Sequence, residues 1–195
     1  MKKDRFSGVG HWWWKLLCVL LLFYTFVYGF LIAIPELPIL EQSIRNLFFH
    51  VPMWFTMIAL MLSSTIFGIY YLVKEDIVYD VKSYNIAVVG FVFGLMGLAT
   101  GMVWAEVTCG AWWVFQEVKL NAAGAGVLIY AAYFILRGSL EEEEKRARFS
   151  AVYNVFAFVL FYVFIMVIPR LDVNSLHTGN GGNPGFNSYD LDNNL

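Results

Sequence analysis

Long apolar stretches separated by short polar segments dominate the pattern along the chain. Most of these stretches approach the roughly 20 residues that an α-helix needs to cross the hydrocarbon core of a bilayer. The fourth stretch is short but rich in alanine and glycine, which suits close packing between helices. The pattern predicts five membrane-spanning helices, over residues 16–34, 51–73, 84–104, 120–136 and 150–168.

The composition supports a location in a membrane. Hydrophobic residues make up 59% of the chain and charged residues only 14%, which leaves too little polar surface for a soluble domain. We therefore expect an all-α integral membrane protein with one membrane domain over residues 1–195. The predicted spans contain no Asp, Glu, Lys, Arg or His in their interiors. This argues against an ion-coupled transporter, because such proteins place ionisable groups at membrane depth.

The positions of the basic residues predict the orientation. Lys and Arg concentrate before the first span, between the second and third, and between the fourth and fifth. Because such segments stay in the cytoplasm, we expect a multi-pass membrane protein with a cytoplasmic N-terminus. The loop 104–121 and the tail 169–195 then face the periplasm, where the cations are Arg45, Lys119 and Arg170. A net charge of -2 without a basic stripe predicts no nucleic-acid partner.

The three histidines of the chain lie on different predicted sides of the membrane. His50 lies at the outer mouth of the second predicted span, just before Pro52, a residue that the first turn of a helix tolerates. His177 lies in the outer tail. His11 falls on the cytoplasmic side next to a run of tryptophans, where aromatic residues usually anchor a protein in the headgroup region. We assign His11 no chemistry.

The outer loop 104–121 is rich in aromatic residues. A belt at headgroup depth is the ordinary explanation for aromatic residues at a membrane boundary. Histidines and cations on the same side favour a haem site instead, because haem needs aromatic walls, imidazole ligands and cations for its propionates. No Cys-x-x-Cys pair exists for covalent attachment of haem. The candidate aromatic contacts are Trp104, Trp112, Trp113 and Phe115.

At these positions the chain resembles the haem-handling proteins of cytochrome c maturation, of the CcmC type and more distantly of the CcsA type. The aromatic loop resembles the tryptophan-rich WWD signature of that family. Other matching segments follow in the same order and on the same predicted side. They are Arg45-Asn-Leu-Phe-Phe-His50-Val-Pro52, Thr100-Gly-Met-Val-Trp104, Ile168-Pro-Arg170 and Ser175-Leu-His177-Thr-Gly179.

The resemblance implies that His50 and His177 are the axial ligands of the iron in a transiently bound haem b, with the loop aromatics as the contact surface. It also implies delivery of the haem to a periplasmic chaperone like CcmE, and ABC-transporter subunits like CcmA and CcmB as further partners. Neutral imidazole is the coordinating form, so protonation near its ordinary pKa of about 6.5 should compete with binding.

The chain also departs from the family pattern. Cys109 stands where the signature begins with tryptophan, as a third iron ligand or as a small replacement. Glu117 takes the place of the family's aspartate. Arg45, Lys119 and Arg170 are our candidates to pair with the propionates, the arginines bidentately. The family adds a sixth helix after the second histidine, so we expect six helices in the full-length protein and a truncated or short form here.

Two other functions remain open from the residues. One is a bis-histidine haem subunit for quinone-linked electron transfer, although ligands at a helix mouth and in a tail favour loading and release of haem. The other is a structural subunit of a transporter. An enzyme is not expected, because no nucleophile with a base and no paired carboxylates within the membrane can be assembled. Besides haem and protein partners, we expect contact with membrane lipid.

Overall fold

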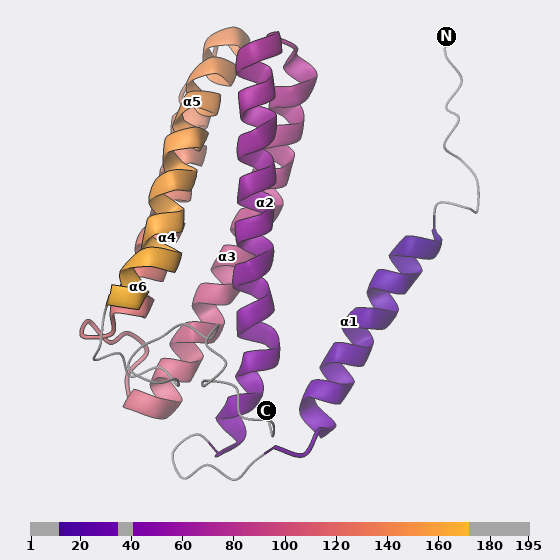
Figure 1. Ribbon diagram of the computed structural model, residues 1–195, viewed down its shortest axis with the longest axis vertical. Helices are drawn as coiled ribbons and strands as arrows, with labels where there is room; N and C mark the ends of the chain where they lie inside the picture. The colour runs from indigo at the N-terminus through magenta and orange to yellow at the C-terminus, as the bar shows by residue number, and fades with distance from the viewer. Residues whose placement is uncertain (1–11, 35–40, 172–195) are drawn as a thin grey trace.

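Helices make up most of the part of the chain that the computed structural model describes, residues 12–34 and 41–171 (Figure 1). Within these described residues, five helical segments are long and apolar enough to cross a membrane. This confirms the predicted all-α membrane fold. In chain order the elements are α1 (Trp13–Leu31), a 3-10 turn η2 (Glu41–Asn46), α2 (Leu47–Lys74), α3 (Ile77–Cys109), α4 (Val118–Gly138), α5 (Glu143–Tyr162), a π-helical turn η3 (Val163–Val167) and α6 (Ile168–Leu171).

The helices extend beyond most of the predicted spans, because helix ends are set by capping and not by hydrophobicity. α3 begins where the Asp76 carboxylate accepts a hydrogen bond from the Val78 N–H at 3.0 Å. It ends where Gly110 adopts a left-handed backbone with φ of 71°. α3 therefore occupies Ile77–Cys109, and the first residues of the predicted loop 104–121 are helical. The irregular loop comprises only residues 110–117.

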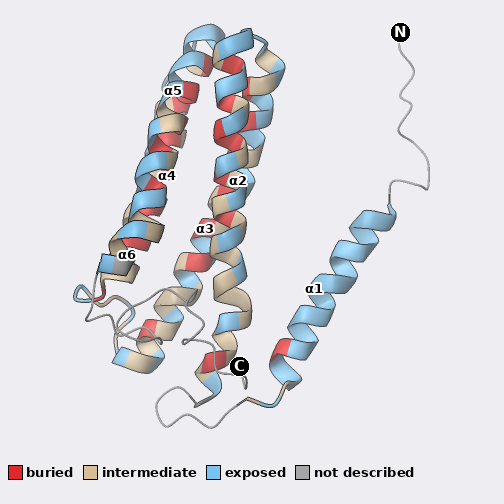
Figure 2. Cartoon of the chain, viewed as in Figure 1, coloured by how far each residue is buried: buried red, intermediate tan, exposed pale blue. Residues whose placement is uncertain are grey.

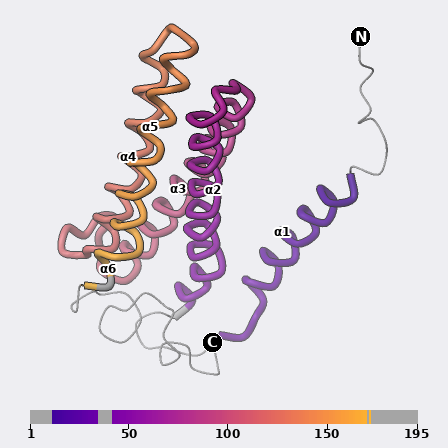
Figure 3. The backbone as a smooth tube through the Cα atoms, turned by 45° about the horizontal axis from the view of Figure 1, so that its top comes forward, coloured from indigo at the N-terminus to yellow at the C-terminus, as the bar shows by residue number. Residues whose placement is uncertain are grey.

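α2, α3, α4 and α5 form an antiparallel bundle (Figures 1 and 3). α2 pairs with α3, and α5 packs against both α2 and α4. The buried core between them includes Met57, Met61, Tyr130 and Phe161. The first turn of α2, the last turns of α3, the loop 110–117, the first turn of α4 and α6 lie together at one end, which we call the loop end. The other end of the bundle carries the α2–α3 and α4–α5 connections.

Glycines at helical spacing let α2 and α3 approach closely. A Cβ atom added at Gly94 would lie 2.4 Å from the Met57 sulfur, and one at Gly101 would lie 3.0 Å from His50 Cε1. Small residues of this kind let large side chains of a neighbouring helix lie against the backbone. The glycines of α3 are Gly90, Gly94, Gly97 and Gly101, and the α2 side chains over them are Met61, Met57, Trp54 and His50.

α1 stands apart from the bundle over most of its length (Figures 1 and 2). Its residues are exposed with the exception of Gly29, and most are apolar, which suits a lipid environment. Near its C-terminal end, the Phe26 and Phe30 rings lie 4.9 and 5.5 Å from the Phe49 ring. Arg45 also donates hydrogen bonds from one terminal nitrogen to the carbonyls of Gly29 and Ile32, both at 2.9 Å. α1 is therefore attached to the loop end.

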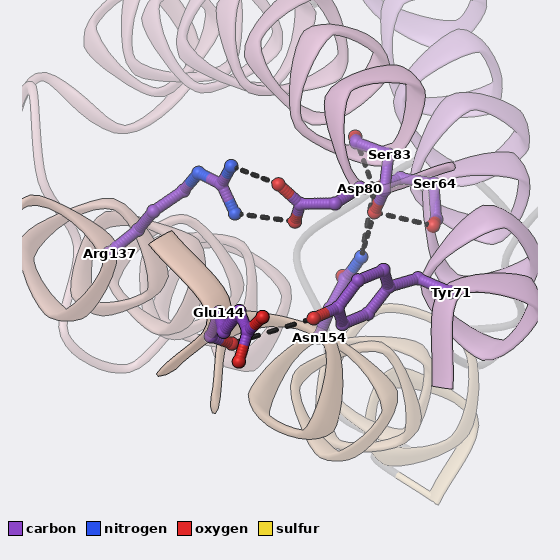
Figure 4. A network of polar contacts seen from close by, with 7 residues as sticks. All are labelled: Ser64, Tyr71, Asp80, Ser83, Arg137, Glu144 and Asn154. Atoms are coloured by element: carbon purple, nitrogen blue, oxygen red, sulfur yellow. Dashed lines mark hydrogen bonds and ion pairs between the residues drawn. The ribbon is translucent and has the colours of Figure 1, made fainter. Parts of the chain in front are cut away.

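A polar network lies in the half of the bundle away from the loop end (Figure 4). The Ser64 and Ser83 hydroxyls each donate to the other residue's carbonyl at 2.8 Å, and the Asn154 amide donates to Ser64 Oγ at 2.8 Å. Asp80 and Arg137 form a buried ion pair beside them. Both charges lie outside the predicted spans 84–104 and 120–136 but inside the observed helices. The predicted spans themselves carry neither charge, whereas the observed helices are longer than the apolar runs and include this pair.

Candidate functional site

The fold brings the described candidate residues to the loop end of the bundle. Antiparallel packing places the start of α2 beside the end of α3, and the loop 110–117 leads directly into α4 (Figure 1). His177 lies outside the described residues with the rest of the tail after Leu171, as does the side chain of Arg170. The described candidates at this end are Arg45, His50, Trp104, Trp112, Trp113, Phe115, Glu117 and Lys119.

His50 lies within the first turn of α2, because that helix begins at Leu47 and not at residue 51. Pro52 consequently lies in the second turn, and the expectation of a first-turn proline was wrong. The imidazole is partly buried against α3, with Nδ1 3.0 Å from Thr100 Oγ1. Its ring meets the Trp54 ring edge-on, with centroids 6.3 Å apart. The ring is therefore held in one place by neighbours from both helices.

The aromatic residues of the loop face different surroundings. The side chains of Trp112 and Phe115 are 55% and 80% exposed. Trp113 turns towards α4, where its indole N–H donates to Asn121 Oδ1 at 3.1 Å. A Cβ atom added at Gly124 would lie only 2.6 Å from the Trp113 ring, so a glycine is needed there. Trp112 and Phe115 offer free aromatic surface, whereas Trp113 anchors the loop.

Asn121 organises the loop from the first turn of α4. Its amide nitrogen donates to the carbonyls of Phe115 at 2.7 Å and Glu117 at 3.0 Å, while its oxygen accepts from Trp113. One side chain thus satisfies two backbone acceptors and one indole donor. Asn121 had no separate role in the sequence analysis. An amide residue just after an aromatic loop was the available signal for this role.

Glu117 is the N-cap residue of α4. Its carboxylate is buried and accepts a hydrogen bond from the Lys119 backbone N–H at 3.3 Å. A negative charge is stabilised at this position by the unpaired N–H groups and the helix dipole. The side chain of Lys119 is itself partly buried. Glu117 therefore defines where the loop ends and α4 begins.

Arg45 and Cys109 complete the described candidates. The Arg45 guanidinium donates to the Gln42 side chain at 2.8 Å as well as to the α1 carbonyls. A propionate at Arg45 would have to share this guanidinium with the end of α1. Cys109 is exposed in the last turn of α3, and Cys18 is exposed in α1. Both thiols are free.

The chain matches a known protein family over most of its length. The family profile CcmC, described as Heme exporter protein C, matches residues 2–180. The chain belongs to this family. Family membership confirms the resemblance that the histidine segments and the aromatic loop indicated.

Individual relatives share modest sequence identity with parts of this chain. The chain is 34% identical to the cytochrome c biogenesis protein CcsA of Prochlorococcus marinus subsp. pastoris over 84 residues, which are 43% of this chain and 26% of the relative. It is 27% identical to the Heme exporter protein C of Paracoccus denitrificans over 126 residues, 65% of this chain and 51% of the relative. The chain therefore spans about a quarter to a half of the length of these relatives.

Proposed function

We propose that this protein handles haem in the biogenesis of c-type cytochromes, binding it at the loop end. One observation carries the proposal. In a chain of the Heme exporter protein C family, the His50 imidazole lies at the same end of the bundle as the exposed rings of Trp112 and Phe115. An imidazole for iron and free aromatic surface for the porphyrin are two of the three requirements of a haem site.

His50 and His177 are the proposed axial ligands of the iron. Neutral imidazole can ligate through the ring nitrogen that carries a lone pair. His50 is positioned by its contacts with α3, and His177 follows α6 in the sequence. α6, the last described element before His177 in the sequence, lies at the same loop end as the first turn of α2 (Figure 1). We propose that the haem is haem b and that it is bound transiently.

The loop residues divide into those that contact haem and those that shape the loop. Trp112 and Phe115 form the proposed contact surface, with Trp104 on the α3 side. Trp113 and Glu117 act indirectly, through their contacts with α4. For the propionates we propose Lys119 and Arg170, while Arg45 contributes mainly by holding α1.

We further propose that the loop end faces the periplasm across the bacterial inner membrane. Lys74, Lys82 and Arg137 lie at the opposite end of the bundle, which is the distribution expected of a cytoplasmic side. Haem at the loop end would then pass to a periplasmic chaperone like CcmE. ABC-transporter subunits like CcmA and CcmB are the proposed membrane partners. This role is transfer of haem and not catalysis.

The test is an absorption spectrum of the full chain purified from haem-sufficient cells. The parent protein should carry the spectrum of haem with two histidine ligands, and His50→Ala and His177→Ala should each lose it. His11→Ala is the matched control and should retain it. Retention of the parent spectrum by both His50→Ala and His177→Ala contradicts the proposed ligands.

A second measurement separates the proposal from electron transfer. On addition of a haem-free CcmE-like chaperone, the haem should leave the purified protein. Haem that stays bound under these conditions and is reduced by a quinol would instead favour the quinone-linked electron carrier. Absence of haem from the parent protein would favour a structural subunit.

A further inference from the structure

Thr100 lies one helical turn before Trp104 on α3 and has three polar neighbours. Its hydroxyl oxygen is 3.0 Å from the Met96 carbonyl and 2.9 Å from the Gly97 carbonyl. The same oxygen is 3.0 Å from His50 Nδ1. Each of these separations is within the range of a hydrogen bond. The three contacts together determine where the protons lie.

A threonine hydroxyl carries one proton and can accept through its lone pairs. Backbone carbonyls can only accept hydrogen bonds, so the Thr100 hydroxyl must donate its proton towards the Met96 and Gly97 carbonyls. If the hydroxyl donated to His50 instead, two pairs of oxygen atoms would lie about 3 Å apart with no proton between them. The hydroxyl oxygen therefore accepts, and the imidazole donates from Nδ1.

We infer that Thr100 is a positioning residue that fixes His50 as the neutral tautomer protonated at Nδ1. The lone pair then lies on Nε2, the nitrogen that would ligate iron. The part that concerns iron rests on the proposed function, whereas the tautomer does not. Histidines that ligate metals commonly donate their other N–H to an acceptor, which orients the ring and raises the basicity of the ligating nitrogen.

The surroundings of this hydrogen bond prevent the ring from turning away. The Asn46 side chain donates to the Thr100 carbonyl at 3.0 Å, which ties the turn before α2 to α3. Gly101 lies beneath the ring and leaves room for it, as a Cβ atom there would be 3.0 Å from His50 Cε1. Trp54 meets the ring edge-on. Packing between α2 and α3 thus fixes the positions of the His50 ring and the Thr100 hydroxyl and leaves room for the ring over Gly101.

The tautomer can be measured in the haem-free full chain by 15N NMR of labelled histidine, since the chemical shift distinguishes a protonated ring nitrogen from one with a lone pair. The chain has three histidines, so the signals missing from His50→Gln identify those of His50. We expect the parent His50 to be protonated at Nδ1. Thr100→Ser should keep that form and Thr100→Val should lose it. A parent His50 protonated at Nε2 would overturn the inference, without any reliance on a variant that might misfold.

Thr108→Val is the matched control. Thr108 lies on the same helix and also donates to a carbonyl four residues earlier, that of Trp104 at 2.8 Å. Its replacement removes the same hydroxyl without touching the Thr100–His50 contact, so the His50 tautomer should not change. A change as large as that of Thr100→Val would mean that the tautomer responds to general loosening of α3, and would overturn the inference.

The consequence for haem is tested separately in the loaded protein. Thr100→Val should weaken haem affinity by about 10- to 100-fold and raise the reduction potential of the haem, because the imidazole becomes a weaker electron donor. Thr100→Ser should restore both values. A normal potential in Thr100→Val overturns the part of the inference that concerns iron. If His50→Ala keeps its haem spectrum, the proposed ligation of iron by His50 fails while the tautomer result is unaffected.

Discussion

Arg137 and Asp80 form a bidentate ion pair that joins α4 to α3, with nitrogen–oxygen distances of 2.7 and 2.6 Å (Figure 4). The two side chains are only 10% and 6% exposed. The Tyr84 ring lies beneath the guanidinium, 4.6 Å from its carbon. A buried charge is tolerated when it is paired, whereas removal of one partner leaves the other without compensation. The pair therefore links the α2–α3 helix pair to the α4–α5 helix pair.

Neutralising one member of this pair should destabilise the fold strongly. Asp80→Asn leaves the Arg137 charge buried, and we expect a loss of about 3–5 kcal/mol in the free energy of unfolding. The thermal unfolding midpoint of the protein in detergent should fall accordingly. Asp80→Asn combined with Arg137→Gln should lose less than the sum of the two single variants, because the double variant buries no unpaired charge.

The control for that experiment is the exposed pair of Lys145 and Glu142, 2.7 Å apart with side chains 64% and 58% exposed. Ion pairs in water contribute about 0–1 kcal/mol, so Glu142→Gln should barely move the midpoint. Equal midpoints for Asp80→Asn and Glu142→Gln would show that the buried pair does not fasten α3 to α4.

The glycine positions of α3 should be sensitive to a single methyl group. In Gly94→Ala the new Cβ would lie 2.4 Å from the sulfur of Met57, a fully buried side chain that must change its rotamer. Overpacking of this kind costs about 1–3 kcal/mol, which a lower thermal midpoint would report. Gly138→Ala is the control, since a Cβ there meets nothing within 4 Å. A Gly94→Ala midpoint as high as that of Gly138→Ala would contradict close α2–α3 packing.

Much of the fold could be predicted because the five apolar runs carry a strong signal of helix type and number. The helix ends could not, since Asp76 and Glu117 set them through local hydrogen bonds and not through hydrophobicity. The ion pair was also missed, because Asp80 and Arg137 are 57 positions apart and outside the apolar runs. The glycines of α3 recur at the spacing of one helix face, a signal that was not used in the sequence analysis.

The residue types of the candidate site could be predicted from the sequence, but the surroundings that each side chain faces could not. The sequence suggested His50 and the tryptophans from their chemistry and their predicted side of the membrane, and their role in binding haem stays a prediction. Neighbouring residues Trp112 and Trp113 nevertheless have different surroundings, one exposed and the other bonded to Asn121. No period distinguishes two adjacent residues in an irregular loop. Their roles depend on the course of the backbone after Gly110, which only the structure gives.

Asn121→Asp should loosen the loop 110–117. The carboxylate can still accept from Trp113, but it cannot donate to the carbonyls of Phe115 and Glu117, which lie 2.7 and 3.0 Å from the amide nitrogen. The loss of these bonds should cost about 1–3 kcal/mol. Hydrogen exchange by mass spectrometry should show faster exchange across the loop and the first turn of α4.

Asn85→Asp provides the same chemical change at an exposed position of α3 and should leave exchange in the loop as it is. Slow exchange in the loop of Asn121→Asp would mean that the backbone course does not depend on the amide. In that case the anchoring of Trp113 would also have to come from its packing on Gly124 alone.

Trp112→Ala and Trp113→Ala should separate haem contact from loop support. Trp112 is 55% exposed, so its removal should hardly change the thermal midpoint of the haem-free protein. Under the proposed function its ring becomes covered by haem, and burial of a large apolar side chain contributes about 1.5–3 kcal/mol. Haem affinity in Trp112→Ala should therefore fall by roughly 10- to 100-fold.

Trp113→Ala, in contrast, should lower the thermal midpoint of the haem-free protein, because it removes the packing on Gly124 and the bond to Asn121. Unchanged haem affinity in Trp112→Ala, together with a lowered affinity in Trp113→Ala, would reverse the roles assigned to the two rings.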